Sequence, residues 1–171
     1  MDECTPAVRL WSPRTHQDWE QARGILAEYG ASLSVDLSFQ SFDRELEDLP
    51  NCYAGAGEVF LLAMVDEALA GCCALKLLPD AGEVFACEMR RLYVRPAFRG
   101  FGLGRLMVDS LMHRAREEGF VAMLVDTLSD MEAARHLYAS LGFESVAPYY
   151  FNPLPGAHYF RVALDTVVSR Y

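Results

Sequence analysis

The glycine-rich stretch VRPAFRGFGLGRL, residues 94–106, constrains the fold and the chemistry of this chain more than any other segment. A strand-like run ends at Val94, and a helix-like run begins near Leu103. Between them, flanked by Arg99 and Arg105, lie three alternating glycines: Gly100, Gly102 and Gly104. Glycine has no Cβ, so such a turn can direct several backbone N–H groups at one point. The helix start adds unpaired N–H groups and a positive dipole end, and the arginines add charge. The stretch therefore predicts a phosphate or pyrophosphate cradle, unless the glycines form only a tight turn.

The spacing of these glycines excludes two common phosphate-binding patterns. The Walker pattern requires Gly-Lys-Ser/Thr, and dinucleotide folds require G-x-G-x-x-G after a strand; neither is present. We therefore expect neither ATP nor NAD as the ligand, and a nucleotide-binding protein is the most distant alternative. The net charge of −9, from 15 basic and 24 acidic residues, argues against a nucleic-acid partner.

The hydrophobic pattern predicts seven strands and four helices. The strands are expected at residues 7–13, 59–66, 68–78, 84–94, 121–128, 143–150 and 157–164. The helices are expected at residues 15–30, 41–50, 103–119 and 131–142. Thr15 with Asp18, and Ser129 with Glu132, have the spacing of helix-capping boxes, and Pro50 is expected to stop the second helix. Antiparallel strands followed by a βαβ crossover predict an α/β fold (α+β, mixed sheet) with helices on both faces.

Length and composition predict one domain, residues 1–171, in the cytoplasm. The chain is 52% hydrophobic, but no apolar run approaches the roughly 18 residues of a membrane-spanning helix, and the N-terminus does not resemble a secretion signal. Five cysteines, an odd number without metal-ligand spacing, are expected to be reduced: Cys4, Cys52, Cys72, Cys73 and Cys87. Three isolated histidines, His113, His136 and His158, imply no metal site.

Two motifs resemble those of the GCN5-related N-acetyltransferase (GNAT) superfamily. The segment from Arg99 to Gly104, RGFGLG, matches the R/Q-x-x-G-x-G/A signature between the fourth strand and the third helix. The segment AARHLYASLGF, residues 133–143, is similar to the second family motif. The resemblance covers most of the chain, and it implies the GNAT fold, with a twisted mixed sheet of about seven strands, and an acetyl-CoA-dependent N-acetyltransferase.

The resemblance also implies where acetyl-CoA would bind. In the family the fourth and fifth strands splay apart, and the pantetheine lies in the gap. By position, the backbone amides of Leu92 and Val94 would bind it, with Leu92 near the acetyl carbonyl. The pyrophosphate would lie on the segment from Arg99 to Arg105, against Gly100, Gly102 and Gly104. One residue departs from the family: Met131 stands where an asparagine is usual, which removes a polar contact to the cofactor.

Two catalytic residues follow from the resemblance. Tyr138 occupies the general-acid position, where a phenol of pKa about 10 can protonate the departing thiolate; the alternative is a tyrosine of the core. Glu88 aligns with the acidic residue that serves some members as base. Strand alternation would put Glu88 and Leu92 on one face. A structural ion pair between Glu88 and Arg90 is the competing interpretation.

The expected acceptor is the primary amine of a small molecule, and the expected assembly is a monomer or homodimer without nucleic acid, membrane or metal. Tyr149, Tyr150 and Asn152 are candidates for the acceptor pocket, although aromatic residues there could serve packing alone. Two alternatives remain open: acetylation of a protein N-terminus or lysine, and a sensor module that binds acyl-CoA without turnover.

Overall fold

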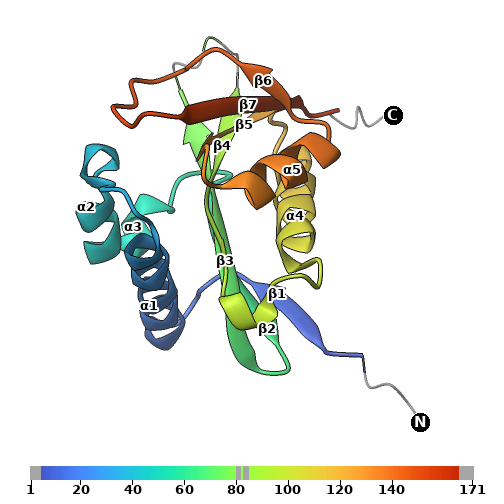
Figure 1. Ribbon diagram of the computed structural model, residues 1–171. Coiled ribbons are helices and arrows are strands. Elements are labelled where there is room, and N and C mark those ends of the chain that lie inside the picture. Colours follow the sequence, from blue (N-terminus) through green and yellow to red (C-terminus); the bar gives the residue numbers. More distant parts are fainter. Residues whose placement is uncertain (1–4, 80–81, 83–84, 166–171) are drawn as a thin grey trace.

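The computed structural model describes residues 5–79, 82 and 85–165, and it contains a seven-stranded mixed sheet (Figure 1). The order of the strands is β1-β2-β3-β4-β5-β7-β6, and β4 and β5 run parallel while the other neighbours are antiparallel. Their bounds are Val8–Trp11 (β1), Val59–Val65 (β2), Ala68–Leu78 (β3), Ala86–Val94 (β4), Ala122–Leu128 (β5), Glu144–Val146 (β6) and Ala157–Ala163 (β7). The mixed sheet confirms the predicted fold class.

The helices cover both faces of this sheet, as Figure 1 shows. They are α1 (His16–Ser32), α2 (Phe42–Glu47), α3 (Leu49–Cys52), α4 (Leu103–Glu117) and α5 (Glu132–Ser140), with 3-10 turns η1 (Ser38–Gln40) and η2 (Pro96–Phe98). On one face α1, α2 and α3 bury Ile25, Phe42 and Leu49 against the sheet. On the other face α4 and α5 pack in a second core around Met107 and Leu111.

Local signals predicted some element ends correctly and others wrongly. Thr15 and Asp18 form the predicted capping box at the start of α1. Ser129 and Glu132 do not: α5 begins after Met131 without a side-chain cap, because the Ser129 hydroxyl bonds to the carbonyl of Gly156. Pro50 does not end the second helix; it lies in the first turn of α3, where its missing N–H costs nothing.

The β2–β3 hairpin turns at Asp66 and Glu67, as predicted, and both residues have positive φ. The strand expected at residues 143–150 is shorter, because only Glu144–Val146 pairs with β7. The turn expected at residues 79–84 lies partly outside the described residues, and Cys4 lies wholly outside them. The other four cysteines form no disulfide.

A β-bulge in β4 shapes the centre of the molecule. Arg91 has a φ of 58°, and the pairing with β3 shifts between Cys72 and Ala74, opposite Tyr93 and Arg90. A bulge inserts one extra residue, so the alternation of side chains reverses beyond it. Before the bulge, the odd-numbered residues of β4, such as Met89, face α4. After the bulge, the even-numbered residues, such as Leu92, face α4.

The parallel pair β4–β5 separates halfway along its length. Pairing runs from Ala86 with Ala122 to Glu88 with Leu124, and no pair is formed beyond that point. The rest of β4 and β5 therefore diverges and leaves a gap in the sheet. Within the described part of the chain, no helix is long and apolar enough to cross a membrane.

Candidate active site

The glycine turn between η2 and α4 presents a row of unbonded backbone amides. Gly100 and Gly102 have φ values of 84° and 80°, in the left-handed region that favours glycine. Along α4, the first backbone amide that donates a hydrogen bond to a preceding carbonyl is that of Leu106, which donates to Gly102. The amides of residues 100–105 donate to no described residue. This arrangement is a cradle for an anion at the start of a helix of 15 residues.

The two flanking arginines are anchored differently. The Arg99 Nε donates to the carbonyl of Val94 at 2.8 Å, and its guanidinium lies over the ring of Tyr93. Arg105 donates to the hydroxyl of Ser140 on α5 at 3.1 Å. Both arginines line the same groove, so the cradle carries two positive charges.

A groove of about 470 Å³, hereafter the cofactor groove, leads away from the cradle between β4 and α5. Leu92 and Val94 form one wall, and Ala133, Ala134 and Leu137 form the other. A Cβ on Gly104 would lie between these walls, 3.6 Å from Leu137 and 3.9 Å from Val94, without a clash inside the protein. The space kept free by Gly104 therefore belongs to the groove, which fits a long, narrow ligand with an anionic end.

The backbone of β4 offers polar groups to this groove. The amide of Arg95 donates to Ala70 of β3 at 2.8 Å, so it points away from the gap. Because amide directions alternate along a strand, those of Val94 and Leu92 point into the gap. The carbonyl of Val94 points there as well, since it accepts from Arg99. These are the two residues that the family resemblance assigned to the pantetheine.

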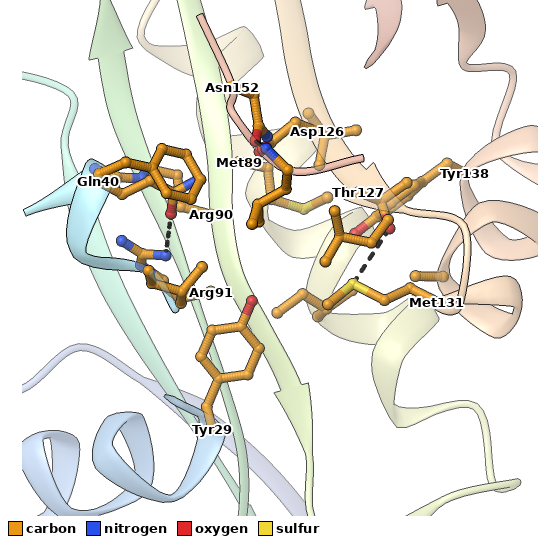
Figure 2. Close-up of a pocket in the computed structure, with 17 residues that line it drawn as sticks. Tyr29, Gln40, Met89, Arg90, Arg91, Asp126, Thr127, Met131, Tyr138 and Asn152 are labelled. Carbon is orange, nitrogen blue, oxygen red and sulfur yellow. Dashed lines mark hydrogen bonds between the residues drawn. The ribbon is translucent and has the colours of Figure 1, made fainter. Parts of the chain in front are cut away.

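A second cavity, hereafter the inner pocket, continues from the cofactor groove into the gap between β4 and β5 (Figure 2). The two cavities share Leu92, Met131 and Ala134. The inner pocket holds only about 70 Å³, yet polar side chains from several elements line it: Tyr29, Gln40, Arg90, Arg91, Asp126, Thr127, Tyr138 and Asn152. The space suits an amine with a few neighbouring atoms.

Tyr138 lines the inner pocket and is 3% exposed. Its ring packs against Phe143 and Phe160, so it is a core residue as well as a pocket residue. Burial, with smaller contributions from Tyr29, Asp126 and Cys73, raises the pKa of its phenol well above the ordinary value. The hydroxyl therefore stays protonated at neutral pH.

The predicted placement of Glu88 beside Leu92 is wrong, and the bulge at Arg91 is the reason. Leu92 faces α4 and α5, whereas Glu88 faces the opposite side and pairs with Arg90, with 3.3 Å between its Oε1 and the Arg90 Nε. The structural ion pair therefore exists. Burial raises the pKa of the Glu88 carboxyl, although Arg90 acts in the opposite direction.

Glu88 lines a third cavity, hereafter the outer pocket, of about 270 Å³. This pocket lies on the face of α2 and shares Phe39, Gln40 and Arg90 with the inner pocket. Lys76, Leu78 and Tyr150 complete much of its wall. The three cavities thus adjoin one another, from the cradle, through the gap in the sheet, to the opposite face.

A hydrogen-bonded network separates the inner pocket from the outer pocket. The Tyr150 hydroxyl donates to Asp126 of β5, and it accepts from Gln40 at 3.0 Å and from Asn152 at 3.2 Å. The Gln40 Oε1 accepts from Arg91 at 2.6 Å (Figure 2). Tyr150 and Asn152 were predicted at the acceptor pocket, and both take part in this network. The Tyr149 hydroxyl is buried near Glu88 and makes no hydrogen bond of ordinary geometry to a described residue.

Arg91 is held by Glu45 of α2. Its Nη2 donates to Glu45 Oε2 at 2.7 Å, and Tyr53 donates to the same carboxylate. Desolvation acts to raise the pKa of Glu45, but the charge and hydrogen bonds of Arg91 outweigh it, so this pKa lies below its ordinary value. The pair fixes the strand at the bulge.

Sequence reasoning missed Asp126, Arg91, Gln40 and Glu45. Two signals were available: Asp126 is the one charged residue in the run VAMLVDTL, and Arg90 with Arg91 interrupts the alternation of β4. Met131 does line the cofactor groove, where its sulfur accepts a hydrogen bond from Thr127 at 3.4 Å. Of the residues that the structure describes, no three His, Cys, Asp or Glu side chains form a group suited to a metal ion.

Comparison with known proteins agrees with this geometry. A profile described as "Acetyltransferase (GNAT) family" matches residues 15–143. A protein of Schizosaccharomyces pombe, described as an uncharacterised N-acetyltransferase, is 36% identical over 159 residues, which are 92% of this chain and 96% of that protein. The chain therefore belongs to the GNAT acetyltransferase family, and it is an N-acetyltransferase.

Two solved structures share the fold. A GNAT-family acetyltransferase of Staphylococcus aureus has a TM-score of 0.74 and 17% identity, over 92% of this chain and 99% of that one. An acetyltransferase of Salmonella typhimurium, solved with its cofactor acetyl-CoA, has a TM-score of 0.68 and 20% identity, over 95% of this chain and 97% of that one.

Proposed function

We propose that this enzyme transfers an acetyl group from acetyl-CoA to the primary amine of a small molecule. The observation that carries the proposal is the series of adjoining cavities. An anion cradle lies at one end, and a tyrosine and a carboxylate meet in the small pocket at the middle. Direct attack of the amine on the thioester requires both substrates to meet at such a point.

The cofactor groove suits acetyl-CoA, whose bound thioester would supply the activated acetyl group. The amides of residues 100–105, with Arg99 and Arg105, would bind the pyrophosphate. The amides of Leu92 and Val94 would bind the pantetheine, and that of Leu92 would donate to the acetyl oxygen as negative charge develops on it. The acetyl-CoA bound in the Salmonella relative supports this assignment.

Tyr138 would act as the general acid, because it lines the pocket where the thiolate leaves. Its raised pKa keeps the hydroxyl protonated before the transfer, and it also makes the transfer to the thiolate more uphill than it would be for a phenol of ordinary pKa. Two carboxylates compete for the proton of the amine. Asp126 lines the inner pocket, and this position favours it. Burial raises the pKa of Glu88, which favours proton uptake, but Glu88 lies in the outer pocket and would need a water to relay the proton. We propose Asp126 as the group that receives the amine and Glu88 as the alternative base.

The small volume of the inner pocket, about 70 Å³, supports a small acceptor over a protein. Gln40 and Tyr150, bonded to each other at 3.0 Å, stand between the two pockets, so the acceptor must pass beside a fixed pair of side chains. Peptide acceptors tested beside small amines would distinguish the two substrate classes.

The proposal is tested first by thermal unfolding with acetyl-CoA, ATP and NAD. A ligand at about 100 times its dissociation constant adds roughly 2.7 kcal/mol to stability. A shift with acetyl-CoA alone is expected; no shift would overturn the cofactor assignment. Release of free CoA with a panel of amines then tests turnover. Binding without any acceptor-dependent release would instead favour the sensor module.

A further inference from the structure

We propose that Arg90 binds a carboxylate of the acceptor, so that the natural acceptors are amino acids or closely related amino carboxylates. This inference rests on the proposed function, and it names the substrate class for that site. Arg90 donates no hydrogen bond to a described residue, whereas the other two cations around the acceptor pockets, Arg91 and Lys76, each do.

Arg90 is a half-buried cation without a hydrogen bond to a described residue. Its side chain is 18% exposed, and its charged contacts are Glu88 at 3.3 Å and Glu45 at 3.9 Å. Among the described residues it donates no hydrogen bond, although a guanidinium has five N–H donors. Arg90 is not among the described residues with a buried, unpaired side-chain nitrogen, so its free donors are open to the pockets that it lines, where a ligand can supply acceptors.

The carboxylates near Arg90 do not satisfy it. Glu45 is engaged by Arg91 and by Tyr53. Glu88 lies on the Nε side of the guanidinium and is shifted towards its neutral form by burial. N–H donors of Arg90 therefore stay available for a carboxylate of a ligand. A carboxylate can accept two parallel hydrogen bonds from a guanidinium.

The other two cations nearby are already bonded. Arg91 donates to Glu45 and Gln40 and is 6% exposed. Lys76 donates to the carbonyl of Cys52 and pairs with Glu58 at 3.5 Å. Arg90 alone of the three lines both the inner and the outer pocket.

The position of Arg90 matches the layout of an amino acid. The inner pocket has room for the amine and a few atoms, and Asp126 offers it a negative charge. Arg90 offers a positive charge at the boundary with the outer pocket. An acceptor with an amine at one end and a carboxylate close by meets a complementary charge at each end.

The test compares acceptors that differ only in the carboxylate. Each series contains an amino acid, its carboxamide and its decarboxylated amine: phenylalanine, phenylalaninamide and phenethylamine, with an equivalent series from alanine. We expect kcat/KM to be at least tenfold higher for the acid than for the amide. In Arg90→Gln the ratio of kcat/KM for the acid to that for the amide should fall to about one, because only the acid loses its partner, and Arg90→Lys should restore part of this ratio.

Binding without catalysis supplies a second readout. Calorimetric titration of the N-acetylated amino acid should give a measurable affinity that Arg90→Gln weakens at least tenfold, whereas the N-acetylated amide should bind both proteins alike. If Arg90→Gln unfolds, the double variant Glu88→Gln/Arg90→Gln, which removes both charges, is compared instead in these titrations, which need no catalytic base.

The outcomes separate this inference from the proposed function. Turnover of amides and decarboxylated amines as fast as acids would overturn the role of Arg90 and leave the acetyltransferase intact. Equal losses for acids and amides in Arg90→Gln would also overturn it. If no amine raises CoA release above the blank, the proposed function itself fails.

Discussion

Arg91 and Glu45 join β4 to α2 through a buried ion pair, with 2.7 Å between the Arg91 Nη2 and Glu45 Oε2. Arg91 is also the residue with positive φ at the bulge. The pair therefore stabilises a backbone conformation that an arginine seldom adopts. Beyond it, Leu92 and Val94 turn towards the cofactor groove.

Removing one partner of this pair should destabilise the protein strongly. Glu45→Ala leaves the Arg91 guanidinium buried and without its carboxylate, and breaking such a pair costs about 3–5 kcal/mol. Urea denaturation should therefore show a loss of that size in the free energy of unfolding. Asp43→Ala, at an exposed site on the same helix, is the control and should change it by less than about 0.5 kcal/mol. Equal effects of the two substitutions would contradict the structural role of the pair.

Stability should fall in acid partly through Glu45. The pKa of this carboxyl in the folded protein lies below its ordinary 4.5, so the unfolded chain takes up the proton first as the pH drops. The stabilisation is complete well above pH 4.5 and is lost as the pH falls through that value towards the folded pKa. Urea denaturation at pH 7, 5 and 4 should show the advantage of the wild type over Glu45→Gln shrinking at the lowest pH. A constant difference would rule out this linkage.

Tyr138→Phe should lower kcat by about 10²-fold or more, the lower end of the range for a general acid. The ring and its packing remain, so the acetyl-CoA-induced shift in melting temperature should not change. Because the pKa of Tyr138 is raised by burial, its deprotonation should not limit the wild-type rate up to about pH 10. Tyr159→Phe serves as a comparison: Tyr159 lines none of the three cavities, but its ring packs against Tyr149 and Tyr150, so it reports the cost of removing a hydroxyl beside the acceptor network. Unchanged turnover in Tyr138→Phe would remove the tyrosine from the mechanism.

Asp126→Asn and Glu88→Gln distinguish the two candidate bases. If Asp126 receives the amine, its substitution should lower kcat/KM by at least 10²-fold, and Glu88→Gln should have a smaller effect. Steady-state rates at several pH values give the comparison. The reverse order of effects would assign the base to Glu88, whose raised pKa would then appear as an acidic limb of the rate above the ordinary value of 4.5.

Gly104→Ala should weaken acetyl-CoA binding and leave the fold intact. The added Cβ has ordinary contacts with Leu137 and Val94 but occupies the cofactor groove. Gly24→Ala, an exposed helical glycine with no neighbour within 4 Å of its added Cβ, is the matched control. The control should gain about 0.5–1 kcal/mol of stability and keep its full acetyl-CoA shift. An undiminished shift in Gly104→Ala would place the ligand elsewhere.

The elements of the fold were predictable because each has a local cause. Thr15 caps α1 through contacts within four residues, and the apolar face of α4 repeats at helical spacing. The same reasoning failed where contacts between residues far apart in the sequence determine the local structure. Ser129 bonds to Gly156 instead of capping α5, and an arginine at positive φ in β4 depends on Glu45, which is 46 residues away.

The candidate site also has a part that consecutive residues predict and a part that forms only when distant residues meet in the folded chain. The glycine turn before α4 lies within a few consecutive residues, so the sequence motif predicted its position, while its role as an anion cradle stays a prediction. The inner pocket is built from α1, η1, β4, β5, α5 and the segment before β7, and only the folded chain brings Gln40, Asp126 and Tyr150 together. Strict alternation of side chains along β4 predicted that Glu88 and Leu92 share a face. The single bulge at Arg91, between them, reverses the alternation and puts them on opposite faces.

The gap between β4 and β5 has a consequence for the order of events in turnover. The cofactor groove lies on the face of α4 and α5, and the outer pocket lies on the face of α2, so under the proposed function each substrate has its own entrance. Neither substrate has to depart before the other arrives. The kinetics that follow from this layout are those of a ternary complex, with intersecting double-reciprocal plots, and the enzyme has no need to carry the acetyl group on one of its own side chains between two half-reactions.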